Sequence, residues 1–381
     1  MPKRPHLVIA AGGTGGHMVP AHVLGQEMMA RGYAVSLITD DRGMRYPGLF
    51  DGCPRHVVES GSLSGLNPLG WVKALLSIRK GRAAAKAIYR REHPVAVVGF
   101  GGYPTLPALL GAFAIGVPTI IHDSNTVLGR VNRMLAARVN VIATAFPHIR
   151  RLPVRQGGKV ALVGNPVRAE IVALRALPFP PTDGALRLLV IGGSQGATIL
   201  SRIVPAAVDR LPAALKSRLR VTQQCRPEDL DQVRAAYAAA GVPADLATFL
   251  QDMPERLAAA HLVVARSGAS TVSELAVAGR PAIFVPLPTS TDNHQVYNAQ
   301  EMVEAGGAKM ILQPDFTPDA VAAAIGHFLG SPATLTAAAA AAGSTGRPDA
   351  AARLADIVEA LGKRGRAAAS GAAVKLQKVP A

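Results

Sequence analysis

The sequence contains few cysteines and few aromatic residues. Of its 381 residues only two are cysteines, Cys53 and Cys225, and they stand far apart, in no CxxC or Cys/His spacing. A disulfide scaffold and a structural zinc site are therefore excluded, and a reducing compartment is expected. Apolar residues make up 49% of the chain, which is enough for full hydrophobic cores and excludes wholesale disorder. The length predicts about two or three domains.

Long apolar runs that would mark a signal peptide or a membrane span are also missing. The apolar run from Leu7 stops at Ala11, before a glycine cluster, and is too short for a signal peptide. The uncharged stretch Val95–Ile121 is long enough to span a membrane, but prolines and glycines interrupt it throughout. It is interpreted as a strand at 95–98, a glycine loop, a buried helix and a strand at 119–121. A cytosolic protein is expected.

Acidic residues are scarce as well. The 41 Lys and Arg outnumber the 25 Asp and Glu, which leaves a net charge of +16. Much of this excess lies in two segments without acidic residues, 66–91 and 363–381. The second is rich in alanine and glycine and is predicted to be a disordered basic tail. Neither segment carries spaced aromatics or a recognition motif for nucleic acid, so no nucleic-acid partner is expected.

The segment 66–91 predicts an amphipathic helix. Apolar residues recur near helical spacing among its cations, at Leu69, Trp71, Val72, Leu75, Leu76 and Ile78. An apolar stripe with a tryptophan at one end and a collar of Lys and Arg suits an anionic membrane surface. The pattern fits equally well a helix whose apolar face packs on its own domain, and the sequence leaves both interpretations open.

Two similar glycine loops indicate two similar domains. Leu7–Gly16 and Leu188–Ala197 each read as a buried strand that runs into a glycine turn and then a helix. Strand-like and helical runs alternate along most of the chain, which is typical of parallel α/β sheets. We therefore predict two Rossmann-like doubly wound domains facing one another across a cleft, with ligands beyond the carboxyl ends of the strands. Neither loop matches the GxGxxG or Walker pattern, which disfavours hydride transfer and P-loop chemistry.

A third segment, 263–286, reads as strand, Ser/Gly turn, short helix and strand. Ser267, Gly268, Ser270 and Thr271 crowd the helix start with small donors, which suits a diphosphate. Glu274 either forms a capping box with Thr271 or accepts hydrogen bonds from the ribose hydroxyls of a nucleotide. The following stretch Asp292–Asn298 is expected to supply polar side chains on the same rim.

The sequence gives little sign of a metal site. Asp229-Leu-Asp231 formally matches the DxD motif of metal-dependent glycosyltransferases, but it lies in a charged helical run with no evident strand on either side. We interpret it as a solvated helix start. The ten histidines form no HExxH or other ligand cluster.

Seven motifs stand in one order along nearly the whole chain. They are Gly12–His17, Gly101–Tyr103, His122–Asn125, Val163–Arg168, Gly192–Gly196, Arg266–Glu274 and Asp292–Asn298. In this content and order the chain resembles the inverting N-acetylglucosaminyltransferases that complete the lipid-linked disaccharide precursor of bacterial peptidoglycan. One departure is His122-Asp-Ser-Asn125, where family members often have Glu-Gln in the middle.

The resemblance implies a metal-independent GT-B enzyme without a cofactor. Residues 1–165 would form the acceptor domain at the cytoplasmic face of the plasma membrane, and residues 166–344 the domain that binds UDP-N-acetylglucosamine. Residues 345–362 would pack back on the first domain, before the tail at 363–381. The acceptor would be undecaprenyl-diphosphate-muramoyl-pentapeptide, and an anionic membrane surface would be a further partner.

The resemblance also assigns site residues. The donor contacts carried over are Thr14, Gly15, Gly16, Asn125, Arg168, Ser194, Leu250, Ala269, Ser270, Thr271, Val272, Ser273, Glu274 and Gln295. His17 is the expected catalytic base, because an imidazole titrates near neutrality; alternatively it only binds the acceptor or caps a helix. Tyr103 and His122 are acceptor-side candidates, while Asp40 and Asp41 follow a strand in a loop of unknown position.

Three rival functions stay open at this point. A transferase of the same fold would act on another lipid, such as diacylglycerol. A regulator would bind the nucleotide sugar without turnover. A sugar-nucleotide epimerase would need no lipid at all.

Overall fold

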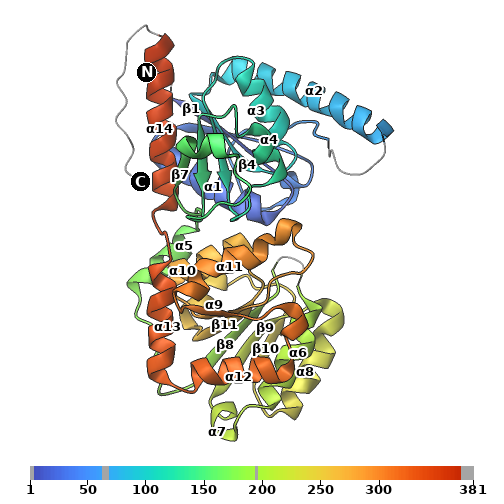
Figure 1. Cartoon of the computed structure of the whole chain (residues 1–381), viewed down its shortest axis with the longest axis vertical. Coiled ribbons are helices and arrows are strands. Elements are labelled where there is room, and N and C mark those ends of the chain that lie inside the picture. Colours follow the sequence, from blue (N-terminus) through green and yellow to red (C-terminus); the bar gives the residue numbers. More distant parts are fainter. Residues whose placement is uncertain (1–3, 62–67, 194–195, 370–381) are drawn as a thin grey trace. The chain divides into compact units, whose positions relative to one another are not determined.

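The computed structural model describes residues 4–61, 68–193 and 196–369 (Figure 1). The chain divides into two units. Unit 1 comprises Met1–Arg168 and Pro348–Ala381, and unit 2 comprises Ala169–Arg347. Each unit is built on one parallel sheet whose strand order reverses in the middle. The predicted class of two Rossmann-like, doubly wound α/β domains is therefore confirmed.

Unit 1 contains a seven-stranded sheet of order β3-β2-β1-β4-β5-β6-β7, parallel throughout. Its strands are β1 (His6–Ala11), β2 (Ala34–Thr39), β3 (Arg55–Val57), β4 (Ala96–Gly101), β5 (Thr119–Asp123), β6 (Val141–Thr144) and β7 (Val160–Leu162). The order reverses between β1 and β4, which makes the loops after these two strands the expected place for a ligand.

Helices cover both faces of this sheet. Leu7 and Ile9 of β1 pack in a core with α1 (Gly15–Ala30) and α14 (Ala350–Ala369). Val8 and Ala10 pack on the other face, in a core with α2 (Pro68–Glu92), α3 (Thr105–Phe113) and α4 (Arg130–Leu135). Successive side chains of a strand point to opposite faces, so one apolar strand serves two cores.

The C-terminal helix α14 lies beside α1 in unit 1 (Figure 1), although the two helices are far apart in the sequence. Leu354 and Val358 are fully buried in the core that α1 shares. At the C-terminal end of α1, Arg31 donates to Asp356 at 2.6 Å and to the carbonyl oxygen of Ala352 at 3.2 Å. Helix α14 continues to Ala369, so the segment expected to be disordered from Lys363 begins as helix; residues 370–381 lie outside the described part.

The long helix α2 presents two different faces. Ala74, Ile78 and Ala85 are buried against the rest of unit 1. Trp71, Val72, Leu75 and Leu76 are 53%, 59%, 56% and 56% exposed, and we call these four residues the outer face of α2. Ile78 therefore belongs to the core. Its assignment to the apolar stripe in the sequence interpretation was wrong. The side chain of Leu69 lies outside the described part.

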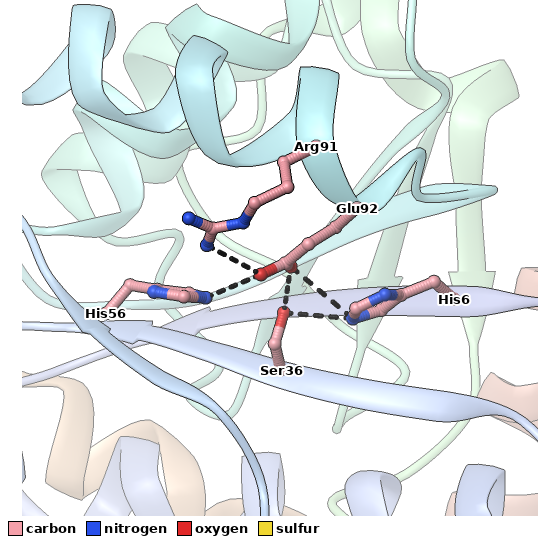
Figure 2. A network of polar contacts seen from close by, with 5 residues as sticks. All are labelled: His6, Ser36, His56, Arg91 and Glu92. Carbon is pink, nitrogen blue, oxygen red and sulfur yellow. Dashed lines mark hydrogen bonds and ion pairs between the residues drawn. The ribbon is translucent and has the colours of Figure 1, made fainter.

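A largely buried carboxylate ties the end of α2 to three strands (Figure 2). Glu92 accepts a hydrogen bond from Ser36 Oγ of β2 at 2.7 Å, and His56 Nε2 of β3 lies 2.7 Å from its other oxygen. His6 Nε2 of β1 lies 3.4 Å away. Burial alone would raise the pKa of the Glu92 carboxyl, but the hydrogen bonds from Ser36 and His56 and the charge of the two histidines hold the pKa below its ordinary value.

Unit 2 contains a six-stranded parallel sheet of order β10-β9-β8-β11-β12-β13. Its strands are β8 (Leu186–Ile191), β9 (Leu219–Gln224), β10 (Ala244–Ala247), β11 (Leu262–Ala265), β12 (Ala282–Phe284) and β13 (Ala308–Met310). The order reverses between β8 and β11.

The helices of unit 2 begin with the short α5 (Ala169–Val172), which follows directly on unit 1. The others are α6 (Thr198–Asp209), α7 (Ala213–Lys216), α8 (Leu230–Ala239), α9 (Met253–Ala259), α10 (Ala269–Ala278), α11 (His294–Glu304), α12 (Pro318–Leu329) and α13 (Pro332–Ser344). Apolar residues of β8, β11 and β12 join those of α6, α8 and α12 in one core. Both glycine loops thus follow a buried strand and precede a helix, as predicted.

The uncharged stretch 95–121 is a buried part of unit 1. It forms β4, α3 and β5, which confirms the expected strand, helix and strand. Within the described ranges no single helix has the length and apolarity of a membrane span, and one pair, α12 with α13, reaches them only across a 93° bend.

Candidate functional site

In unit 1 two glycine loops touch at the switch point of the sheet. Ala11 of β1 is in register with Gly101 of β4, so the loops after these strands begin side by side. A Cβ atom at Gly102, where φ is +82°, would lie 2.5 Å from the carbonyl oxygen of Gly12. Only glycine fits such an approach. The contact fixes the loop 12–14 against the loop 101–103.

His17 lies on this pair of loops, in the first turn of α1. Its Nδ1 atom is 3.1 Å from the carbonyl oxygen of Gly12, and a carbonyl can only accept a hydrogen bond. We therefore assign the proton of the neutral ring to Nδ1, which leaves the lone pair on Nε2. Nε2 faces Gly101, where a Cβ atom would come within 2.9 Å of it. The site thus holds an imidazole in the tautomer that a general base needs.

His122, the other histidine candidate, is buried beneath the loops. It has no exposed surface, its Nε2 lies 2.9 Å from the carbonyl oxygen of Gly164, and its ring lies against Phe100. Burial and the charge of nearby His17 lower the pKa of His122 to about 4. The His122 side chain therefore has no exposed atom that an acceptor could contact in this conformation.

Asp123 is a buried carboxylate that the sequence analysis noted only as a departure from the family motif, without a role in the site. It accepts hydrogen bonds from the amides of Gly129 at 2.7 Å and Asn125 at 3.1 Å, and from the Asn132 side chain at 2.9 Å. Burial raises the pKa of Asp123, and this effect exceeds the opposite effect of the hydrogen bonds and of the charge of His17. The carboxylate shapes the loop that carries Asn125. An acidic residue at the end of β5, next to a motif histidine, was the available signal.

The remaining candidates of unit 1 are distributed around the same loops. Thr14 and Gly16 are exposed and Gly15 half-buried, at the start of α1. Asn125 is half-buried after β5, and Tyr103 is 39% exposed after β4. Arg168 is half-buried at the end of unit 1, well along the chain from the other candidates. Asp40, whose loop had no predicted position, lies directly beneath the glycine loop, where it accepts from the amide of Gly13 at 3.3 Å.

In unit 2 the corresponding loops follow β8 and β11. Ile191 of β8 is in register with Ala265 of β11, so Gly192 and Arg266 leave the sheet side by side. Helix α10 begins directly after the second loop. Among the residues that the structure describes, the hydroxyls of Ser267 and Ser270 are buried and have no hydrogen-bond partner. Both hydroxyls lie inside the turn at which α10 begins.

Glu274 does not form the capping box that the sequence allowed. The N-cap of α10 is Gly268, and Thr271 already lies inside the helix, whereas a capping box requires the threonine at the N-cap. The capping interpretation is therefore wrong. Glu274 is half-buried one turn further along α10, and the nucleotide interpretation remains for it. The first five residues of the same helix are Ala269, Ser270, Thr271, Val272 and Ser273.

Three polar side chains hold the loops around α10. Asn298 of α11 is fully buried and donates to the carbonyl oxygen of Ser267 at 3.3 Å. Arg266 donates to the carbonyl oxygens of Val285 and Pro286 at 3.0 and 3.2 Å. Gln295 accepts from the amide of Leu287 at 2.9 Å. Asn298 is thus part of the interior and not of the rim where the sequence placed it.

Two donor candidates remain. Leu250 is buried in the loop between β10 and α9. Ser194 lies outside the described residues.

The DxD motif was placed only partly correctly. Asp231 is solvated, with a 98% exposed side chain that pairs with Arg234 at 2.8 Å. Asp229 is only 8% exposed. Strands β9 and β10 flank the motif, so the expectation of no neighbouring strands is wrong. In the described parts of the chain, no group of three or more His, Cys, Asp or Glu is arranged to hold a metal ion.

Comparison with known proteins gives matches along most of the chain. The glycosyltransferase family 28 N-terminal domain matches residues 7–144, and the family 28 C-terminal domain matches residues 187–354. A protein of Erythrobacter litoralis is 54% identical over 359 residues, covering 94% of this chain and 90% of its own. A protein of Sphingopyxis alaskensis is 54% identical over 356 residues, covering 93% and 91%. Both are named UDP-N-acetylglucosamine--N-acetylmuramyl-(pentapeptide) pyrophosphoryl-undecaprenol N-acetylglucosamine transferase.

Solved structures agree on the architecture. The crystal structure of MurG from Acinetobacter baumannii superposes with a TM-score of 0.76 at 29% identity, covering 93% of this chain and 99% of its own. A UDP-GlcNAc 2-epimerase from Neisseria meningitidis, bound to UDP-GlcNAc, gives a TM-score of 0.65 at 12% identity, covering 93% and 100%. At that identity the second likeness shows the fold alone.

Proposed function

The chain belongs to glycosyltransferase family 28, and from this premise we propose that it transfers N-acetylglucosamine from UDP-N-acetylglucosamine to the 4-hydroxyl of a lipid-linked muramoyl sugar. The acceptor is undecaprenyl-diphosphate-muramoyl-pentapeptide, and the product is the lipid-linked disaccharide precursor of peptidoglycan. Unit 1 takes the acceptor and unit 2 takes the donor nucleotide.

The observation that carries the proposal is the position of His17, whose Nδ1 lies within hydrogen-bond distance of a carbonyl oxygen while its Nε2 faces the second glycine loop. With Nδ1 donating to the carbonyl oxygen of Gly12, Nε2 accepts the proton of the acceptor 4-hydroxyl. The oxygen then attacks the anomeric carbon of N-acetylglucosamine from the side opposite to the diphosphate. The bond between that carbon and the diphosphate oxygen breaks, and UDP departs with the electron pair. One displacement of this kind inverts the anomeric configuration.

The leaving diphosphate needs compensation for its developing charge. The start of α10 offers the amides of a helix N-terminus. The carboxylate of Glu274 accepts hydrogen bonds from the ribose hydroxyls. The proposal keeps as donor contacts Thr14, Gly15, Gly16, Asn125 and Arg168 of unit 1, and Ser194, Leu250, Ala269, Ser270, Thr271, Val272, Ser273 and Gln295 of unit 2.

The acceptor is anchored in a membrane, so the enzyme meets it at a membrane surface. The outer face of α2 supports this step, because four large apolar side chains are more than half exposed there. Lys73, Arg79, Lys80 and Arg82 are exposed on the same helix, and α2 carries no acidic residue before Glu92. Apolar insertion together with attraction to anionic headgroups holds a protein at such a surface. We place the enzyme at the cytoplasmic face of the plasma membrane.

Transfer of radiolabel tests the reaction directly. The full chain is incubated with UDP-N-acetylglucosamine labelled in the sugar and with the muramoyl-pentapeptide lipid, and the organic phase is counted. Label in the lipid fraction is expected. Two control reactions are run in parallel, one with diacylglycerol in place of the muramoyl lipid and one with the donor alone. Label in diacylglycerol, or conversion of the donor without any lipid, would instead support the rival transferase or the epimerase.

A further inference from the structure

An arginine lies over the N-terminal glycine loop, and neither the sequence motifs nor the proposed mechanism use it. Arg42 follows β2, and its Nη2 atom is 3.3 Å from where a Cβ atom at Gly13 would stand. Its guanidinium carbon lies 5.6 Å from the centroid of the Tyr103 ring. The side chain is 53% exposed. A cation is therefore held at the open side of the paired loops.

Asp40 positions this arginine. One oxygen of its carboxylate lies 3.2 Å from Arg42 Nη2, and the other accepts from the amides of Gly13 at 3.3 Å and Gly43 at 2.9 Å. The Asp40 side chain is only 13% exposed. A single, largely buried carboxylate thus ties the guanidinium to the backbone of the glycine loop. Among the described residues Asp40 is the one hydrogen-bond partner of Arg42, and a guanidinium has five N–H donors.

The geometry of the acceptor explains what such a cation is for. The reacting hydroxyl is on C4 of the muramoyl sugar and the diphosphate is on C1, at opposite ends of one ring. The surface that binds this sugar must then have a base at one end and a cation for the diphosphate at the other. His17 lies against Gly12 and Gly101, and Arg42 lies against Gly13 and Tyr103, on the same two touching loops. The planar fork of arginine matches phosphate oxygens in pairs.

We propose that Arg42, positioned by Asp40 and Tyr103, binds the diphosphate of the lipid-linked acceptor. This inference rests on the proposed function, because it takes its ligand from that reaction. A diphosphate is also present in the donor, so the same chemistry has two sources. The proposal commits to the acceptor, and the experiment separates the two.

The experiment compares a charged and an uncharged prenyl competitor. Inhibition constants against the muramoyl lipid are measured for geranylgeranyl diphosphate and for geranylgeraniol, with the wild type, Arg42→Gln and Arg42→Lys. Arg45→Gln is the matched control, since Arg45 is an exposed cation on the short 3-10 turn Gly43–Arg45 that directly follows Arg42. Dissociation constants for UDP are measured in parallel. Thermal unfolding of each variant confirms that it folds.

We expect Arg42→Gln to weaken inhibition by the diphosphate about 10- to 100-fold, the loss typical of a hydrogen bond to a charged group. The uncharged alcohol and UDP should bind as in the wild type, Arg42→Lys should be intermediate, and Arg45→Gln should be unchanged. Equal losses for the diphosphate and the alcohol would show a structural role and overturn the proposal. A loss confined to UDP would assign Arg42 to the donor and overturn it as well.

Failure of the proposed function is a separate outcome. It appears as the absence of labelled muramoyl lipid with the wild-type enzyme, before any variant is compared. If the wild type transfers the sugar but is inhibited equally by the prenyl diphosphate and the prenyl alcohol, only the proposed role of Arg42 is refuted.

Discussion

The Nδ1 atom of His17 lies 3.1 Å from the carbonyl oxygen of Gly12, inside the same loop that brings the histidine to the sheet edge. The backbone itself thus selects the tautomer of the ring. In many enzymes a carboxylate orients the catalytic histidine and stabilises its cation. In this chain a neutral carbonyl orients the ring of His17, and the charge of His17 favours the ionised form of the buried Asp123 against the effect of burial.

Replacement of His17 tests its role as the base. His17→Ala should lower kcat about 100- to 10,000-fold, the range that a positioned general base supplies. The KM for the donor should stay within a few-fold, because the proton is transferred in the transition state. Steady-state kinetics with the muramoyl lipid measure both. His93→Ala is the control, a histidine at the end of α2 away from the loops. An unchanged kcat would leave His17 with acceptor binding or helix capping only.

The paired α/β architecture was predictable because buried parallel strands appear as apolar runs and each ends in a glycine turn. β1 and β8 are of this kind, with five of six residues buried in β1. β10 was missed for the opposite reason: its sequence Ala-Asp-Leu-Ala is partly exposed and carries no apolar run. β9 (Leu219–Gln224) was missed as well, since polar residues interrupt its apolar ones. Without these two strands the Asp229–Asp231 motif had no visible neighbours, and its setting was misjudged.

Side-chain partners far apart in sequence were the part that could not be predicted. Asp40 binds the amide of Gly13, 27 residues away, and no local pattern marks such a contact. The motif Thr271–Glu274 shows the converse error. Its spacing fits a capping box, but Gly268 adopts the extended N-cap conformation, with φ −63° and ψ 144°. The helix therefore starts earlier than the motif suggests.

Glu274 is expected to recognise the ribose of the donor. Glu274→Gln should raise the KM for UDP-N-acetylglucosamine about tenfold or more, since a hydrogen bond to a charged group contributes about 1.5–3 kcal/mol. The KM for the muramoyl lipid should not change. With a 2′,3′-dideoxy-UDP donor, which lacks the ribose hydroxyls, wild type and variant should be equal. A tenfold difference that persists with this donor would place Glu274 elsewhere in the site.

The outer face of α2 is expected to bind membranes. Leu75→Glu combined with Leu76→Glu should lower the partition onto anionic vesicles about 100-fold, because burial of each leucine contributes about 1.5–3 kcal/mol. Sedimentation with vesicles of phosphatidylglycerol and phosphatidylcholine measures this. Ala83→Glu with Ala84→Glu is the matched control, since it adds the same charge at exposed positions of the same helix and leaves the apolar residues. Equal binding by both double variants, or no loss at all, would refute the membrane face.

The Glu92 network should make the stability of unit 1 depend on acid. The pKa of Glu92 is lowered in the folded chain, so the carboxylate binds fewer protons folded than unfolded. Its contribution to stability is therefore complete above the unfolded pKa, about 4.3 for glutamate, and is lost as the pH falls through the lower folded pKa. The groups that face it are His6, His56 and Arg91, together with the hydroxyl of Ser36.

Glu92→Gln isolates this effect. Its melting temperature should lie below that of the wild type at pH 6 to 8, since the glutamine leaves Ser36 and the two histidines without their anionic partner. The difference should begin to shrink as the pH falls below about 4.3, where the carboxyl of the unfolded chain takes up protons. It should be smallest below the lower folded pKa, where the folded wild-type carboxyl is neutral as well. Glu59→Gln is the control, because Glu59 pairs with Lys80 at 3.5 Å on the surface with a 56% exposed side chain, and exposed pairs contribute about 0–1 kcal/mol. A constant gap between Glu92→Gln and the wild type across the whole range would mean that packing around residue 92, and not its charge, holds α2 to the strands.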